Sequence, residues 1–152
     1  MELDKHPLLL IIDDEPRMRL ITQRILALNG FTVKMAGSGE EGLNLLLSAP
    51  VDAVILDVRM SGMDGIVVLK KIRDQYPTLP VIMVTQADEE QIRDEAERLG
   101  VKGYLMKPVN FDHLKQLLNS VTVIAKPANT KSQVSSANGS GSNGSLPKVP
   151  QP

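Results

Sequence analysis

Residues 51–57 read Val-Asp-Ala-Val-Ile-Leu-Asp, and residues 81–85 read Val-Ile-Met-Val-Thr. Both segments carry apolar side chains on at least three successive positions. Neighbouring side chains of a strand point to opposite faces, so these runs predict strands that are buried on both faces. Such strands are typical of a parallel sheet that helices cover on each side.

Further apolar, β-branched runs alternate along the chain with segments of helical period. The predicted strands cover residues 8–12, 32–35, 51–56, 81–85 and 101–106. The predicted helices cover residues 17–28, 40–47, 66–76, 89–99 and 111–124. Repeated strand-then-helix units predict an α/β fold with a doubly wound sheet of five parallel strands.

The boundaries of these helices carry recognisable capping residues. The predicted N-terminal signals are Pro16, Ser38 with Glu41, Asp88 with Gln91, and Asn110. Gly30 and Gly100 stand where the first and fourth helices should end.

The composition narrows the chemistry that the chain can perform. Its 152 residues, 42% hydrophobic and 23% charged, have the size and balance of one globular domain. The formal net charge of −1 disfavours nucleic-acid binding. The absence of Cys excludes thiolate chemistry, and two His residues are too few for a His-rich metal site. Carboxylates, hydroxyls and Lys remain as reactive groups.

Composition also divides the chain. We predict an N-terminal extension over residues 1–6, a folded domain over 7–125, and a flexible Gly/Ser/Asn-rich tail or linker over 126–152. Three of the 17 basic residues and none of the 18 acidic ones lie in that tail, so residues 1–125 have a net charge of −4. Neither a signal peptide nor an apolar run of roughly 20 residues is present, which predicts a cytoplasmic protein without a membrane partner.

Four of the five predicted strands end in polar residues, namely Asp13 and Asp14, Asp57, Thr85, and Lys107. Doubly wound sheets bind ligands beyond the carboxyl ends of their strands, so we expect these side chains to meet at one edge. Each has an ordinary explanation by itself, such as a helix cap, a turn residue or a solvated charge. Capping does not require all of them at one edge, and the combination favours a functional site.

Three neighbouring carboxylates repel one another unless they hold a hard cation, and Mg²⁺ suits oxygen ligands beside a phosphoryl group. Asp57 stands alone after a central strand, where its carboxylate can attack phosphorus and form an aspartyl phosphate. Lys107 can compensate the developing charge, and Thr85 can donate a hydrogen bond to a phosphoryl oxygen.

Five motifs together resemble the receiver domain of two-component response regulators. They are Ile11-Ile12-Asp13-Asp14-Glu15, Leu56-Asp57-Val58-Arg59-Met60, Met63-Asp64-Gly65, Val84-Thr85 and Lys107-Pro108. The similarity runs from about residue 8 to residue 124 and includes every strand end that carries a polar group. It implies a flavodoxin-like fold with strand order 2-1-3-4-5 and five helices.

The resemblance also implies roles at the site. Asp57 would accept a phosphoryl group from a histidine kinase or a histidine phosphotransfer protein. Asp13, Asp14, Asp57 and the backbone carbonyl of Arg59 would bind Mg²⁺. The peptide bond between Lys107 and Pro108 would be cis.

A switch is implied as well. In similar proteins the hydroxyl at the position of Thr85 moves toward the phosphoryl group and the aromatic side chain at the position of Tyr104 rotates inward, which alters the fourth helix, fifth strand and fifth helix. Tyr104 by itself is equally explained as an ordinary sheet aromatic. The fourth helix has an apolar stripe of only Ile92, Ala96 and Leu99 among charged residues, so little buried area would resist its movement.

Three residues depart from the usual family pattern. Ser61 replaces a common Pro, which predicts a looser loop, and Gln86 follows Thr85 where a small residue is usual. Arg59, two residues after Asp57, can reach over the phosphoryl site. We expect Arg59 and Gln86 to tune the lifetime of the phosphoryl group by controlling the access of water.

Two other functions deserve comparison. A phosphatase of the haloacid dehalogenase type would require a second Asp at the position of Arg59 and a cap insertion that the sequence lacks. A degenerate receiver that acts only in docking is disfavoured because every phosphorylation residue is present.

The expected protein is thus not an enzyme with a separate substrate; it catalyses only its own phosphorylation and slow dephosphorylation. The sequence is consistent with a single-domain regulator that acts on a protein partner, or with a truncated receiver of a larger regulator with an output domain. A phosphorylation-dependent dimer is a further expectation from the resemblance.

Overall fold

The computed structural model of the protein describes residues 6–122. The strands are β1 (Leu8–Ile12), β2 (Thr32–Ala36), β3 (Ala53–Asp57), β4 (Val81–Thr85) and β5 (Gly103–Met106). The helices are α1 (Pro16–Leu28), α2 (Gly39–Ser48), α3 (Gly65–Gln75), α4 (Glu90–Arg98) and α5 (Phe111–Thr122). The predicted α/β alternation is confirmed. The predicted tail over residues 126–152 and nearly all of the predicted extension over residues 1–6 lie outside the described residues.

The five strands form one parallel sheet in the order β2-β1-β3-β4-β5, as the resemblance implied. In the central strand β3, Ile55 lies opposite Ile11 of β1, and Asp57 lies opposite Val84 of β4. Every residue of β3 and β4 is buried. The prediction of two covered faces from the apolar runs is therefore confirmed, and Asp57 ends a strand in the middle of the sheet.

Two strands begin two residues later than predicted. Val51 and Val101 are half-buried and pack against the core, but both precede the hydrogen-bonded ladder. The N–H of Val101 instead donates to the carbonyl of Ala96 at 3.2 Å and so closes the end of α4. An apolar run indicates which residues are buried, and at these two strands partial burial extends beyond the hydrogen-bonded part.

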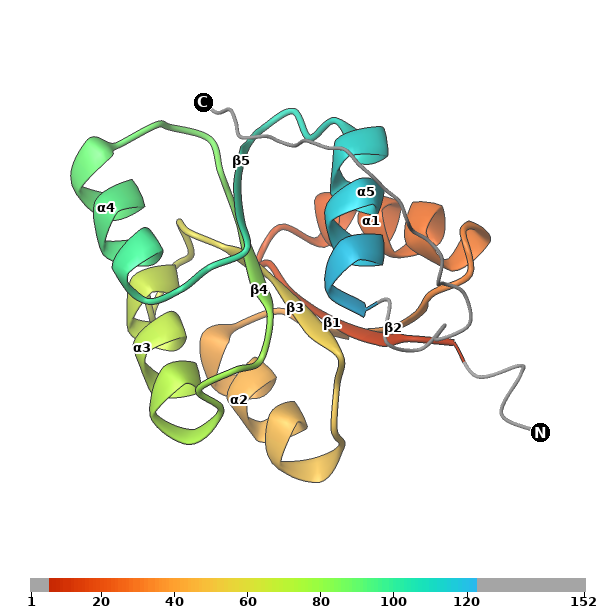
Figure 1. Ribbon diagram of the computed structural model, residues 1–152, viewed down its shortest axis with the longest axis horizontal. Helices are drawn as coiled ribbons and strands as arrows, with labels where there is room; N and C mark the ends of the chain where they lie inside the picture. The colour runs from red at the N-terminus through yellow and green to blue at the C-terminus, as the bar shows by residue number, and fades with distance from the viewer. Residues whose placement is uncertain (1–5, 123–152) are drawn as a thin grey trace, which may run out of the picture. The chain divides into compact units, whose positions relative to one another are not determined.

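The helices form two layers around the sheet. Figure 1 shows α1 and α5 on one side of the sheet and α2, α3 and α4 on the other. Alternate strand residues divide accordingly: Leu10 and Ile12 belong to the core beneath α2, α3 and α4, whereas Leu9 and Ile11 pack with α1 and α5. The carboxyl ends of the strands are left between the two layers.

Two helices begin with the predicted caps. The Ser38 hydroxyl accepts a hydrogen bond from the N–H of Glu41 at 3.1 Å, and the Glu41 carboxylate accepts one from the N–H of Gly37 at 2.8 Å. The Asn110 side chain accepts from the N–H of His113 at 3.0 Å. The bonds from the N–H groups of Glu41 and His113 satisfy donors that the first turn of a helix leaves unpaired.

The predicted cap formed by Asp88 and Gln91 was wrong. The N-cap of α4 is Glu89, whose side chain makes no capping hydrogen bond. The Asp88 carboxylate forms an ion pair with Arg93 instead. The guanidinium thus takes the acceptor that capping would have used, and α4 begins without a side-chain cap.

Among residues 6–122, no helix is both long and apolar enough to span a bilayer.

Candidate functional site

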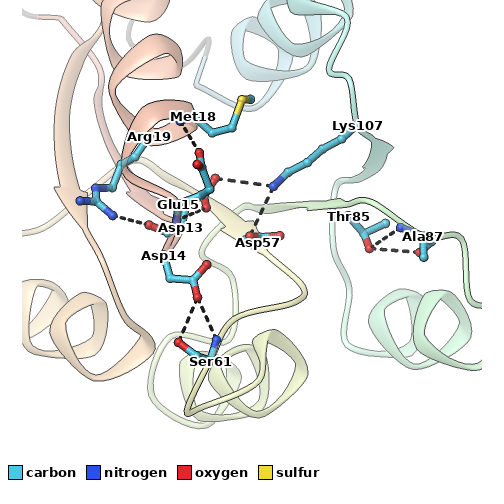
Figure 2. A network of polar contacts seen from close by, with 10 residues as sticks. All are labelled: Asp13, Asp14, Glu15, Met18, Arg19, Asp57, Ser61, Thr85, Ala87 and Lys107. Atoms are coloured by element: carbon cyan, nitrogen blue, oxygen red, sulfur yellow. Dashed lines mark hydrogen bonds and ion pairs between the residues drawn. The ribbon is translucent and has the colours of Figure 1, made fainter.

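The carboxyl edge of the sheet gathers three carboxylates from two strands. Asp13 and Asp14 follow β1, and Asp57 is the last residue of β3. Each side chain offers one oxygen, and these oxygens all lie within 4.8 Å of one another. Asp57 and Asp13 are buried, with 5% and 7% of their surface exposed, and Asp14 is half-buried. Figure 2 shows Asp13 and Asp57 converging with the end of the Lys107 side chain.

Lys107 brings a positive charge to this cluster from the end of β5. Its Nζ lies 3.4 Å from Asp57 Oδ2 and 3.8 Å from Asp13 Oδ2, and only 12% of its side chain is exposed. The Lys107–Pro108 peptide bond is cis. One ammonium among three carboxylates leaves the cluster with excess negative charge, which an oxygen-liganded cation would neutralise.

The charge imbalance is visible at Asp57. The pKa of the Asp57 carboxyl is raised to about 6, because burial and the neighbouring Asp13 carboxylate both raise it and together outweigh the opposing effect of Lys107. The repulsion and desolvation together exceed the attraction of the ammonium. The donor set therefore fits a hard divalent cation: three carboxylates in reach of one another, two of them buried, and no soft ligand among them.

Each acidic residue of the β1–α1 turn is held by a different donor. Asp13 Oδ1 accepts a hydrogen bond from the N–H of Glu15 at 2.9 Å, and the Asp13 carbonyl accepts one from Nη1 of Arg19 at 2.7 Å. Asp14 Oδ2 accepts from both the N–H and the hydroxyl of Ser61, at 2.9 and 3.1 Å. Sequence reasoning missed the contributions of Arg19, Glu15 and Ser61.

The prediction of a looser β3–α3 loop did not include a contact that the structure shows. Ser61 fastens this loop to the acidic turn instead of freeing it. The signal for this contact was the Ser residue itself, because proline has neither an N–H nor a hydroxyl to donate.

The predicted switch residues lie on the other side of Asp57. Thr85 is fully buried, and its hydroxyl donates to the carbonyl of Ala87 at 3.0 Å and accepts from the N–H of Ala87 at 3.2 Å. In Figure 2 this hydroxyl is engaged with Ala87 and not with Asp57. The structure thus places Thr85 at the predicted edge without joining it to the carboxylates.

The Tyr104 hydroxyl is buried and has no hydrogen-bond partner within residues 6–122. Burial raises the pKa of Tyr104, and the nearby Asp88 carboxylate raises it further. Among the described residues, the Tyr104 hydroxyl is thus a buried polar group without a hydrogen-bond partner, which is rare in folded proteins.

Arg59 and Gln86 are both exposed. The Arg59 guanidinium forms an ion pair with Glu89 at the start of α4, and this contact raises the pKa of the guanidinium. The Arg59 side chain thus connects the loop after Asp57 to the loop after Thr85 and does not contact the carboxylates.

Known proteins share this sequence pattern. The sequence model of a protein family described as the response regulator receiver domain matches residues 9–119. An NtrX-like response regulator of Rickettsia bellii (strain RML369-C) is 37% identical over 119 residues, which cover 77% of this chain and 25% of that protein. The transcriptional regulatory protein ZraR of Escherichia coli (strain K12) is 36% identical over 110 residues, which cover 72% of this chain and 25% of ZraR. The chain spans about a quarter of the length of these curated relatives.

Solved structures share the fold. The receiver domain of the Francisella response regulator 1452 has a TM-score of 0.74 and 29% identity, covering 80% of this chain and 100% of that one. The Vibrio cholerae chemotaxis protein CheY4 has a TM-score of 0.71 and 30% identity, covering 76% of this chain and 98% of that one. Together with the sheet order and the acidic edge described above, these similarities show that the chain belongs to the response regulator receiver domain family of two-component systems.

Proposed function

We propose that the protein is a phosphoacceptor and that Asp57 receives the phosphoryl group. The observation that carries this proposal is the position of the Asp57 carboxylate, which ends the central strand between an acidic pair and the Lys107 ammonium, 3.4 Å away. The pKa of about 6 leaves this carboxyl mostly ionised above pH 7, as a nucleophile requires.

The transfer itself breaks one bond and forms one. An Asp57 oxygen attacks the phosphorus of a phosphohistidine, the P–N bond breaks, and the imidazole nitrogen keeps the electron pair and takes a proton. Lys107 balances the negative charge on Asp57 and on the incoming phosphoryl oxygens. The donor would be a histidine kinase or a histidine phosphotransfer protein.

The residues that would hold Mg²⁺ are Asp13, Asp14, Asp57 and the backbone carbonyl of Arg59. When bound, this cation supplies charge neutralisation and a fixed position for phosphoryl oxygens. The three carboxylates fit this role because their oxygens already lie within 4.8 Å of one another.

Phosphorylation would be transmitted through Thr85 and Tyr104. The Thr85 hydroxyl would leave Ala87 and donate to a phosphoryl oxygen, which would move the β4–α4 loop above the Tyr104 hydroxyl. The surface formed by α4, β5 and α5 would change as a result.

Arg59 and Gln86 would tune the phosphoryl lifetime, because both stand on the exposed loops that flank Asp57. Arg59→Ala and Gln86→Ala should change the rate of autodephosphorylation, measured by loss of the phosphoryl label. Unchanged rates in both variants would remove this part of the proposal.

The decisive experiment is phosphorylation with acetyl phosphate and Mg²⁺, followed by intact-protein mass spectrometry, with beryllofluoride binding as a second readout. Wild-type protein should be modified, and Asp57→Asn should abolish modification. Asp74→Asn, a substitution of an exposed Asp on α3, serves as the matched control and should be modified like wild type. Labelling that survives Asp57→Asn would refute the nucleophile assignment.

The wider organisation is part of the same proposal. Residues 7–125 would form the receiver, residues 126–152 would act as a tail or linker, and the switched surface would act on an output domain or a protein partner in the cytoplasm. The protein would form a dimer when phosphorylated, and it would not bind nucleic acid directly. The receiver would act as a signalling domain and would turn over no separate substrate.

A further inference from the structure

Ser61 stands apart from the residues that sequence reasoning assigned to the site. It lies on the exposed β3–α3 loop, and its N–H and hydroxyl both donate to Oδ2 of Asp14, at 2.9 and 3.1 Å (Figure 2). Asp14 and Ser61 are 47 residues apart, so this contact joins the turn after β1 to the loop after β3.

The three carboxylates differ in what holds them. Asp13 is fixed by the N–H of Glu15 within its own turn, and Asp57 lies beside Lys107. Among the described residues, the hydrogen bonds to the Asp14 carboxylate come from Ser61. The orientation of Asp14, the least buried of the three, is thus set by a loop distant in sequence.

The loop that carries Ser61 is itself fixed. The N–H of Gly65 donates to the carbonyl of Val58 at 2.9 Å, and a Cβ at Gly65 would lie 2.3 Å from the carbonyl oxygen of Asp57. Met60 and Met63 pack against the core on either side of Ser61. The two Ser61 donors therefore lie on a loop whose backbone is held against the end of β3.

We propose that Ser61 is a positioning residue for the cation site, which it preorganises by orienting Asp14 and by holding the loop that bears the Arg59 carbonyl against the Asp13–Asp14 turn. The inference rests on the proposed function, since it concerns the same metal site. Both donors use Oδ2, so Oδ1 of Asp14 keeps its lone pairs for a cation. Hydrogen bonds of this kind orient metal ligands and reduce the ordering that binding requires.

The test is the affinity of the chain for Mg²⁺ alone, without a phosphoryl donor, measured by isothermal titration calorimetry. Ser61→Ala removes the hydroxyl and should weaken binding on the order of tenfold, the lower end of the effect typical for lost ligand-orienting hydrogen bonds. Ser61→Thr keeps both donors and should bind within about twofold of wild type. Ser120→Ala, which removes an exposed hydroxyl that bonds the Leu117 carbonyl on α5, is the matched control and should bind like wild type.

A second measurement reports the contact itself in metal-free protein. Asp14→Ala removes the acceptor, so the Ser61 amide should exchange its hydrogen faster than in wild type, whereas the Gly65 amide should keep its protection because its partner is the Val58 carbonyl. Equal exchange at Ser61 in the two proteins would contradict the contact.

The outcomes separate the two proposals. If wild-type protein binds Mg²⁺ and Ser61→Ala binds as tightly or more tightly, the inference about Ser61 is overturned and the proposed function stands. If wild-type protein binds no Mg²⁺ at millimolar concentration, the metal site of the proposed function fails and the inference fails with it. Weakened binding in Ser61→Ala with retained binding in Ser61→Thr supports preorganisation by the hydroxyl.

Discussion

Helices α3 and α4 lie side by side on the same face of the sheet, yet they are attached to it in different ways (Figure 1). The buried residues of α3 are Gly65, Ile66, Val68, Leu69 and Ile72, whereas α4 buries only Ala96. Helix α3 follows Asp57, and α4 follows Thr85. The strand that ends in Asp57 is therefore followed by a firmly packed helix, and the strand that ends in Thr85 is followed by a weakly packed one.

The two ends of α4 differ as well. At its C-terminal end, the Arg73 guanidinium of α3 donates to the carbonyls of Leu99 at 2.6 Å and Gly100 at 3.2 Å. At its N-terminal end, Glu89 makes no capping bond, and the side-chain contacts are two ion pairs between partly exposed groups, Glu89 with Arg59 and Asp88 with Arg93. Helix α4 is therefore anchored at its C-terminal end, which is far from Thr85, and only weakly attached at its N-terminal end, which is near Thr85. This difference favours motion at the N-terminal end.

The largest expected effect is the loss of stability when the packing of α3 is disrupted. Ile72 is fully buried in the core, so Ile72→Ala should lower the free energy of unfolding by about 2–5 kcal/mol. Ile92→Ala on α4, where the side chain is half-buried, should lower it by less than about 1.5 kcal/mol. Urea unfolding of both variants measures the difference, and equal losses would show that the two helices are anchored alike.

The next effect concerns the electrostatic cost at the end of β3. The Asp57 pKa rises from its ordinary 3.8 to about 6 on folding, mainly because the group is buried. The folded protein thus binds this proton more tightly than the unfolded chain, and the resulting stability is full below pH 4 and lost as pH rises through 6. In metal-free buffer at pH 7.5, Asp57→Asn should therefore be more stable than wild type by up to about 3 kcal/mol.

The pH series provides the control for that prediction. The advantage of Asp57→Asn should disappear below pH 4, and Mg²⁺ should reduce it at pH 7.5 because the cation stabilises the ionised cluster. Thr85→Val, at the matching end of β4, removes no ionisable group, so its effect on stability should be independent of pH. An Asp57→Asn advantage that stays constant from pH 4 to pH 8 would contradict the raised pKa.

A smaller effect is expected at the C-terminal anchor of α4. Arg73→Ala removes charged donors from backbone carbonyls at the ends of α3 and α4 and in the loop before β4, and should lower the free energy of unfolding by about 1–2 kcal/mol. Hydrogen exchange should quicken in the last turn of α4. Arg98→Ala, which removes an exposed pair with Glu95, is the control and should leave that turn protected.

The smallest effect is expected at the N-terminal end of α4. Glu89→Gln breaks the pair with Arg59, and because both side chains are substantially exposed the unfolding midpoint should not change measurably. Hydrogen exchange in the first turn of α4 should nevertheless quicken. If Glu89→Gln destabilises the protein as much as Arg73→Ala, then α4 is anchored equally at both ends and the proposed asymmetry is wrong.

Much of the site could be predicted because polar residues at strand ends meet wherever strands are parallel. Asp13, Asp14, Asp57 and Lys107 come together for this reason. Asp88 was predicted wrongly because Arg93, five residues further along the chain, competes with the helix N–H groups for the same carboxylate. The Ser61 contact was missed because its partner lies 47 residues away: the Ser residue indicates that donors are present but not which acceptor they meet.

By itself, the sequence determined the fold class, the covered faces of β3 and β4 and the chemical identity of the edge residues, because these depend on side-chain period and on the alternation of strands with helices. Only the tertiary structure decided which donor holds each carboxylate, that Thr85 bonds Ala87 and not the cluster, and that Arg73 fixes α4 at one end. Whether these groups come close enough to bond depends on how the chain packs, and a sequence pattern does not give the distances between them.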